Sequence, residues 1–233
     1  MKVVECVGLS KNYSSVRAID SLNIQLEGGR IIGLLGPNGC GKTTFMKLLT
    51  GLLSPTEGEV YICGYPRCQE TNSFISYLPE RTYLNSRMTV GSMLGFFTDF
   101  YPDFDIAKAR EMLRAVGVEE SRRISTLSKG NREKVQLVLV MSRRAKLYLL
   151  DEPIAGVDPA ARENILRTIV GNYNENAATI ITTHLIADVE QVIDEFVFMA
   201  QGGRILRRGM ADDVREETGQ TIDQLFREVF RYA

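Results

Sequence analysis

The chain has 233 residues, of which 44% are hydrophobic and 24% are charged. These fractions are close to the averages of folded globular domains, so they exclude a disordered or fibrous chain and allow one large domain, or one domain with a sub-domain. The 28 Lys and Arg residues nearly balance the 29 Asp and Glu residues, which leaves a net charge of -1. Because binding to a nucleic-acid backbone usually needs a basic excess, we expect no nucleic-acid partner.

The sequence carries no membrane or export signal that we can identify. Its longest uncharged stretch, residues 176–187, is shorter than the roughly 20 apolar residues that cross a bilayer. Glu5 and Lys11 fall where a signal peptide has its apolar core. The four cysteines form no C-x-x-C pair, and the only histidine, His184, is far from them in sequence. We therefore expect a cytoplasmic protein with reduced thiols.

The first part of the chain predicts a strand, a loop and a helix in direct succession. Residues 30–35 are an apolar run that follows the turn pair Gly28-Gly29, which indicates a strand. A glycine-rich loop comes next, and the apolar spacing from Phe45 to Leu52 indicates a helix. The loop therefore connects the end of a strand to the start of a helix.

The middle of the chain, about residues 86–144, has helix signals and no convincing strand. Asp105 is a candidate N-cap of an amphipathic helix that ends at Gly117. Residues 135–141 are apolar on nearly every side, which predicts a buried helix. We expect this region to form an α-helical sub-domain inserted into the remaining fold.

The last part returns to alternating strands and helices. The expected elements are a strand at 146–150, a helix that starts at Asp158-Pro159, a strand at 179–183, a hairpin at 196–207 and a packed helix pair at 211–231. This alternation predicts an α/β fold with a mostly parallel sheet and an antiparallel β edge region. The prediction is a single domain over residues 1–233, with a core of residues 1–85 and 145–233.

Residues 36–44 fit the pattern G-x-x-x-x-G-K-[ST], and they lie between a predicted strand and a predicted helix. In such a loop the backbone N–H groups and the helix N-terminus face phosphate oxygens. Lys42 is expected to reach the β- and γ-phosphates, and the Thr43 hydroxyl is expected to bind magnesium. The predicted nucleotide contacts are Gly36, Pro37, Asn38, Gly39, Cys40, Gly41, Lys42, Thr43 and Thr44.

Cys40 lies inside this loop, near Lys42 and a helix N-terminus, and both features lower the pKa of a thiol. We therefore expect Cys40 to be alkylated in preference to the other cysteines and to be protected by bound nucleotide. The alternative is an inert small residue that fills a turn.

A second set of candidate residues is the acidic pair Asp151 and Glu152, which ends an apolar strand. Asp151 is suited to holding magnesium, and Glu152 is suited to aligning an attacking water molecule. Acidic pairs at strand ends are common, so this pair alone is ambiguous. It gains meaning from the phosphate loop and from the segment Leu-Ser-Lys-Gly-Asn at residues 127–131, both of which precede it.

Taken together, these motifs resemble the nucleotide-binding subunit of an ATP-binding cassette (ABC) transporter, over essentially the whole chain. The matching segments, in the order of the family, are residues 36–44 (Walker A), 127–131 (signature), 148–152 (Walker B), 155–158 (D-loop) and 182–184 (switch histidine). The resemblance implies a P-loop NTPase core, hydrolysis of ATP and the ligands ATP and Mg²⁺.

The resemblance also implies roles for single residues. Tyr13 stands where the family has an aromatic residue that stacks on adenine, and His184 stands where it has a histidine that contacts the γ-phosphate. Without their positions, Tyr13 would be an ordinary strand aromatic and His184 an ordinary histidine. The implied catalytic residues are Lys42, Glu152 and His184, and the implied magnesium ligands are Thr43, Glu80 and Asp151.

Two positions depart from the family pattern. Glu80 replaces the usual Gln, and Asn131 replaces a frequent Gln at the end of the signature. Glu80 still offers an oxygen toward magnesium, and Asn131 is still an amide. Neither change removes the resemblance.

The family mechanism involves a second subunit, identical or different, packed head to tail. Ser128, Gly130 and Asp158 of one subunit would then contact the ATP bound by the other. Loss of the γ-phosphate would loosen the dimer and drive a separate transmembrane permease, so that the chain would be peripheral on the inner face of the cell membrane. Residues 93–105 resemble a subgroup that serves separate bacterial permeases, often exporters.

Five aromatic residues fall within nine positions: Phe96, Phe97, Phe100, Tyr101 and Phe104. They predict either a sub-domain core or, on another face, a groove beside Glu80 that receives a short permease helix. Two other functions compete with the transporter. One is a soluble ABC ATPase that powers a cytosolic assembly such as iron-sulfur cluster building, and the other is a kinase, which the signature disfavours.

Overall fold

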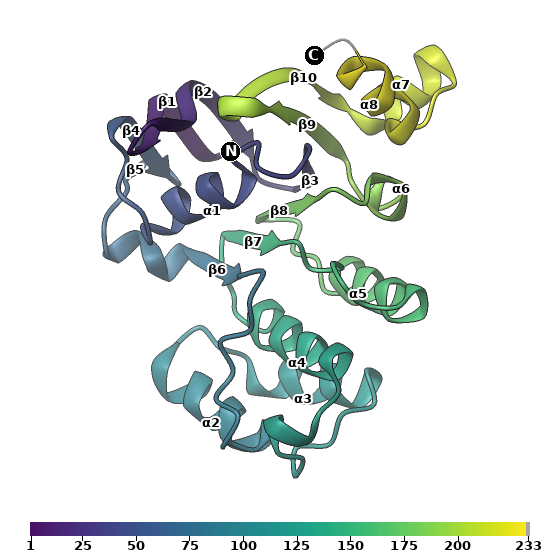
Figure 1. Cartoon of the computed structure of the whole chain (residues 1–233). Helices are drawn as coiled ribbons and strands as arrows, with labels where there is room; N and C mark the ends of the chain where they lie inside the picture. The colour runs from purple at the N-terminus through teal and green to yellow at the C-terminus, as the bar shows by residue number, and fades with distance from the viewer. Residues whose placement is uncertain (232–233) are drawn as a thin grey trace.

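A six-stranded sheet carries most of the motifs (Figure 1). A computed structural model describes residues 1–231. The strand order is β10-β9-β3-β8-β7-β6, parallel throughout except for the hairpin β9-β10. The strands are β3 (Arg30–Leu35), β6 (Ile75–Leu78), β7 (Leu147–Asp151), β8 (Ala178–Thr183), β9 (Glu195–Ala200) and β10 (Arg204–Met210). The mostly parallel sheet with an antiparallel edge, predicted from the sequence, is confirmed.

A second sheet is antiparallel and has the order β2-β1-β4-β5. Its strands are β1 (Lys2–Tyr13), β2 (Val16–Glu27), β4 (Glu57–Ile62) and β5 (Tyr65–Pro66). The sequence analysis did not delimit these strands, because bulges in β1 interrupt the two-residue alternation on which strand prediction depends. Its apolar side chains share one core with helix α1 (Lys42–Thr50) and one face of the six-stranded sheet.

The helices of the second half lie where the sequence predicted them, except for the short α6, which was not predicted. They are α5 (Pro159–Gly171), the short α6 (Ile186–Val189), α7 (Ala211–Thr218) and α8 (Ile222–Phe230). Asp158 caps α5 by accepting a hydrogen bond from the N–H of Ala161 at 3.0 Å. The predicted terminal helix pair is confirmed, with Val214 and Leu225 buried. No helix within residues 1–231 is long and apolar enough to cross a membrane.

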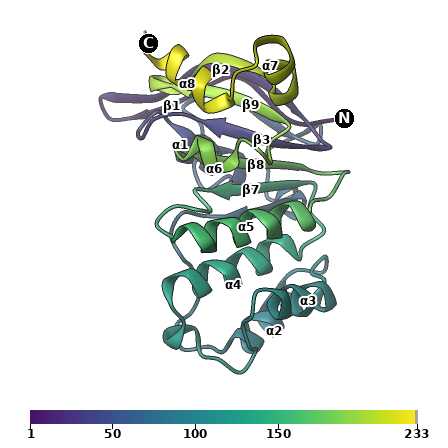
Figure 2. The same cartoon turned by 90° about the vertical axis from the view of Figure 1, so that its right-hand side faces the viewer.

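Residues 86–144 contain helices, two isolated bridges and no longer strand. The helices are α2 (Val90–Phe100), α3 (Ile106–Ala115) and α4 (Lys129–Met141), with the short 3-10 turn η2 (Ile124–Thr126) between α3 and α4. Two further 3-10 turns, η1 (Glu70–Phe74) and η3 (Gln201–Gly203), lie outside this region. Asp105 caps α3, and residues 135–141 of α4 are all buried, as predicted. Both views show α2, α3 and α4 at the end of the molecule opposite α7 and α8 (Figures 1 and 2). The exact limits of a helical sub-domain stay a prediction.

Arg143 joins this helical region to the edge of the sheet. Its guanidinium donates to the backbone carbonyls of Ser73 and Ile75, on η1 and β6. It pairs with Asp103 at 3.1 Å and lies 4.1 Å from the centroid of the Tyr101 ring. The side chain is only 5% exposed, so each of these partners replaces water that the charge has lost.

We expect Arg143→Met to lower the free energy of unfolding by about 2–4 kcal/mol, because it leaves buried carbonyls and Asp103 without their partner. The matched control is Arg144→Met, since Arg144 is 77% exposed and pairs with Asp105 at the surface. That change should cost less than about 1 kcal/mol. Urea unfolding followed by circular dichroism measures both, and equal losses would contradict the role of Arg143.

Candidate active site

The loop between β3 and α1 has a shape that only glycine permits at two positions. A side chain at Gly36 would place its Cβ 2.2 Å from the carbonyl oxygen of Met199. Gly41, the N-cap of α1, has φ 113°, and a Cβ there would lie 2.7 Å from the carbonyl oxygen of Ala18. The backbone can therefore wrap closely around an anion at the start of α1.

Lys42 is buried at the mouth of this loop. Its Nζ donates to the carbonyl oxygens of Gly36 at 2.7 Å and Pro37 at 3.1 Å, and it lies 3.9 Å from Glu152 Oε1. The ammonium group has three N–H donors, so the two carbonyl oxygens fix its position and leave one donor for another acceptor. The cation is thus fixed beside the loop amides and beside a predicted catalytic carboxylate.

A cavity of about 420 Å³ opens beside the loop and collects most of the predicted site. Its walls are Ala18, Asn38, Gly39, Gly41, Lys42, Thr43, Thr44, Glu80, Glu152, Ala155 and His184. These residues come from β2, the phosphate loop with the start of α1, the segment after β6, and the segments that follow β7 and β8. The fold therefore brings together at one cavity motifs that are far apart in the sequence.

Asp151 is buried at the end of β7 and is held by hydroxyl groups. Its Oδ1 accepts hydrogen bonds from Thr182 at 2.7 Å and from Thr43 at 3.1 Å. Burial raises the pKa of Asp151, while the bonds from Thr182 and Thr43 act in the opposite direction. The Tyr77 hydroxyl lies 3.4 Å from Oδ2, and burial raises the pKa of Tyr77, so that hydroxyl keeps its proton.

Glu152 has a strained backbone. Its φ is 51°, in the left-handed region that side chains other than glycine rarely adopt. Its N–H donates to the Thr182 carbonyl at 3.1 Å and lies 3.0 Å from the Thr182 hydroxyl, which holds this conformation. Its carboxylate lies 3.0 Å from Nδ1 of His184. Two predicted catalytic side chains are therefore in direct contact.

The oxygen ligands predicted for magnesium fit that ion. Thr43 and Asp151 are hydrogen-bonded to each other, and Glu80 lines the same cavity. Magnesium in nucleotide sites is bound by one or two carboxylates together with phosphate oxygens, so a closed protein cage is not needed. Within residues 1–231, no cluster of three or more His, Cys, Asp or Glu side chains forms such a cage.

Gly36, Pro37 and Cys40 of the phosphate loop do not line this cavity, and four predicted nucleotide contacts outside the loop do not line it either. Ser128 and Asp158 accept hydrogen bonds from the first turns of α4 and α5, and a side chain at Gly130 would meet open space. Their predicted contacts involve a second subunit and stay predictions. Tyr13 is exposed at the end of β1, with its ring 5.5 Å from Nζ of Lys11. Its stacking on adenine also stays a prediction.

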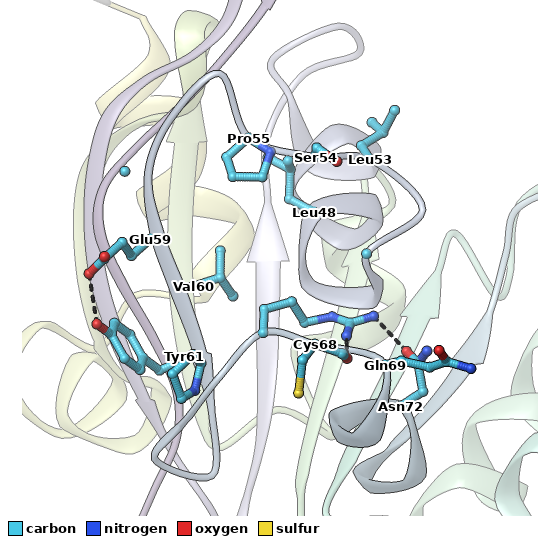
Figure 3. Close-up of a pocket in the computed structure, with 14 residues that line it drawn as sticks. Leu48, Leu53, Ser54, Pro55, Glu59, Val60, Tyr61, Cys68, Gln69 and Asn72 are labelled. Atoms are coloured by element: carbon cyan, nitrogen blue, oxygen red, sulfur yellow. Dashed lines mark hydrogen bonds between the residues drawn. The ribbon is translucent and has the colours of Figure 1, made fainter.

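Another pocket, of about 530 Å³, lies between α1 and the β4-β5 hairpin (Figure 3). Arg67 crosses it and donates to the Leu49 carbonyl at 2.7 Å and to Asn72 Oδ1 at 2.5 Å. On the opposite wall the Tyr61 hydroxyl donates to Glu59 at 2.7 Å. The charged groups of Arg67 and Glu59 are therefore already hydrogen-bonded to other groups of the pocket wall. No residue of the phosphate loop lines this pocket.

Comparison with known proteins agrees with this geometry. The sequence profile described as "ABC transporter" matches residues 19–155. The chain belongs to the ABC transporter family. The "uncharacterized ABC transporter ATP-binding protein YxlF" of Bacillus subtilis is 31% identical over 214 residues, which cover 90% of this chain and 71% of that protein.

Two further relatives match nearly end to end. The "lipopolysaccharide export system ATP-binding protein LptB" of Haemophilus influenzae is 28% identical over 228 residues, 93% of this chain and 94% of that protein. A solved "ATP binding subunit of ABC transporter" superposes with a TM-score of 0.84 at 27% identity, over 98% of this chain and 99% of that one. The predicted family, fold class and ATPase activity are thus confirmed, and the soluble-assembly alternative is not favoured.

Sequence reasoning missed the role of Thr182. This residue contacts both Asp151 and Glu152, and β8 pairs it directly opposite Asp151. The sequence contained one signal, a threonine two residues before the predicted histidine. Only the register of β7 against β8 shows that its hydroxyl reaches the acidic pair.

The expected lowering of the Cys40 pKa, on which its predicted reactivity depends, is wrong. The side chain is fully buried, and this burial raises the pKa of Cys40, with Lys42 lowering it by less. The loop wraps the thiol so closely that desolvation outweighs the nearby positive charge. All four cysteines are free, and their redox state stays a prediction.

We expect iodoacetamide to label native Cys68 first, because it is exposed, and Cys63 next. Cys40 and Cys6 should be labelled last, since burial also raises the pKa of Cys6 to about 12. Timed labelling at neutral pH with peptide mass spectrometry gives the order, and denatured protein serves as the control. Labelling of Cys40 ahead of Cys68 would restore the original hypothesis.

Proposed function

We propose that this chain is the ATP-hydrolysing subunit of a transporter whose permease is a separate membrane protein. The observation that carries the proposal is the contact of Glu152 with both His184 and Lys42 at the rim of the phosphate-loop cavity. A carboxylate, an imidazole and an ammonium group at one cavity can bind a triphosphate and activate water.

Each residue then has a chemical role. The loop amides and Lys42 bind the β- and γ-phosphates, and Glu152 orients water for in-line attack on the γ-phosphorus. His184 contacts the γ-phosphate and keeps Glu152 in place. Thr43, Asp151 and Glu80 hold magnesium, which supplies charge neutralisation for the phosphates when bound.

Two subunits act together in the proposed cycle. Ser128 and Gly130 at the start of α4, with Asp158 at the start of α5, contact the ATP held by the partner subunit. Support comes from the open space at Gly130 and from the N-terminus of α4, which favours an anion. Cleavage of the γ-phosphate removes the group that bridges the subunits, and the dimer opens.

The permease docks in an aromatic groove, which we define as the cavity of about 470 Å³ between the end of α1 and α2. Within the five-residue aromatic cluster, Phe97 is 6% exposed and belongs to the core while its ring also lines the groove, and Phe100 is 66% exposed and lines the groove. The core and the proposed groove therefore share Phe97, and Phe100 is the more accessible side chain for a docked helix. A short apolar permease helix fits such a groove and would hold the chain on the inner face of the membrane.

Glu152→Gln should keep ATP binding and slow hydrolysis by at least about 100-fold, because the neutral amide cannot act as a base. Dimers should then accumulate with ATP and be visible by size-exclusion chromatography. The control is Glu163→Gln, a surface change on α5 that should leave both measurements unchanged. Normal turnover in Glu152→Gln, or no ATP-dependent dimer, would refute the assignment.

Phe100→Asp should abolish co-purification of a membrane protein with the tagged chain from detergent-solubilised membranes of the source cells. A charge in the aromatic groove removes the apolar contact that a docked helix needs. Val170→Asp, on the exposed face of α5, is the matched control and should retain the membrane protein. If Phe100→Asp retains it as well, or if the wild-type chain fractionates only with non-membrane proteins, the proposal fails.

A further inference from the structure

Tyr77 connects two regions that the proposed function treats separately. It lies on β6, which pairs with β7 so that Tyr77 faces Leu149 across the ladder. Side chains alternate along a strand, so Asp151, two residues beyond Leu149, is on the same face as Tyr77. The Tyr77 hydroxyl reaches diagonally to Asp151 Oδ2 at 3.4 Å, close enough for a long hydrogen bond.

The contact differs from the others that Asp151 makes. Thr43 and Thr182 both donate to Oδ1, whereas among residues 1–231 the hydrogen-bond partner of Oδ2 is the Tyr77 hydroxyl. The rotation of the carboxylate therefore depends on groups at both oxygens. Thr43 and Thr182 come from the nucleotide side of the fold, on α1 and β8.

The same side chain also lines the aromatic groove, together with Phe97 and Phe100 from α2 and Tyr101 just after it. Glu80, which the sequence analysis placed beside this groove, lines the nucleotide cavity, and only its neighbour Pro79 reaches the groove wall. Tyr77 is thus a single rigid side chain with one part at the groove and its hydroxyl at Asp151. A helix that fills the groove would contact the ring of Tyr77, and a shift of that ring would also move its hydroxyl.

We propose that Tyr77 is a positioning residue that transmits occupancy of the aromatic groove to the carboxylate of Asp151. The proposal deepens the proposed function and rests on it only in naming the permease as the natural occupant. Because Asp151 is a proposed magnesium ligand, a change in its orientation alters the Mg²⁺ dependence of nucleotide binding. The affinity for nucleotide without metal depends on the loop and Lys42 and should stay nearly the same.

The first test compares Tyr77→Phe with the wild-type chain, using a fluorescent non-hydrolysable ATP analogue with Mg²⁺ or with EDTA. The gain in affinity that Mg²⁺ provides should fall by about threefold to tenfold, the range for one hydrogen bond. The affinity in EDTA should be unchanged, which a general loss of structure would not allow. The matched control is Tyr61→Phe, which removes a hydroxyl bonded to a carboxylate, Glu59, in the other pocket.

The second test fills the groove without a permease. Phe100→Cys in a Cys68→Ser chain is alkylated with N-phenylmaleimide, and Val170→Cys in the same chain is the labelled control. Alkylation at position 100 should shift the Mg²⁺ titration of ATP-analogue binding in the chain that keeps Tyr77. In the Tyr77→Phe chain the same alkylation should shift this titration much less. Labelling at position 170 should have no effect in either chain.

Three results would overturn the proposal: superimposable Mg²⁺ titrations for Tyr77→Phe and wild type, an equal effect of groove labelling in both chains, or no effect of labelling in either. These measurements use the isolated chain and need no permease. Failure of the permease proposal would appear in the co-purification of Phe100→Asp instead, so the two can fail independently.

Discussion

The site depends on one buried carboxylate. Asp151 is almost entirely removed from water, and an unpaired charge in that position would destabilise the fold by several kcal/mol. The hydroxyls of Thr43 and Thr182 compensate by donating to it. Those two bonds also tie the first turn of α1 and the end of β8 to the end of β7. The phosphate loop and the ends of β7 and β8, which carry the proposed site residues, are thus joined through one carboxylate oxygen.

The rest of the catalytic geometry builds on this arrangement. Thr182 also holds the backbone of Glu152 in its left-handed conformation, which turns the carboxylate toward His184 and Lys42. A strained residue persists only when its neighbours fix it, and here the neighbour is the same threonine that holds Asp151. The orientation of Glu152, the proposed base, is therefore coupled to that of Asp151, the proposed metal ligand, and such preorganisation lowers the reorganisation that a reaction needs.

The second region of interest, the aromatic groove, depends on how the helical region attaches to the sheet. Arg143 holds the carbonyls before and at the start of β6, and Tyr77 follows two residues later on that strand. The groove is thus lined along β6 and by Pro79, and the nucleotide cavity begins one residue later at Glu80. Motion of α2 and α4 relative to the sheet can reach the site through β6 and the segment after it, and also through β7, which follows α4 in the chain.

The sequence by itself determined the family, the parallel sheet and the phosphate loop, because glycine spacing, N-caps and apolar runs are local signals. The caps at Asp105, Ser128 and Asp158 are examples, since a cap bonds its own helix. Only the tertiary structure decided the burial of Cys40 and the backbone conformation of Glu152. Burial of Cys40 depends on the loop closing over it, and the environment of Glu152 depends on a threonine 30 positions later. Strand register and desolvation arise from packing between distant segments, so no local pattern records them.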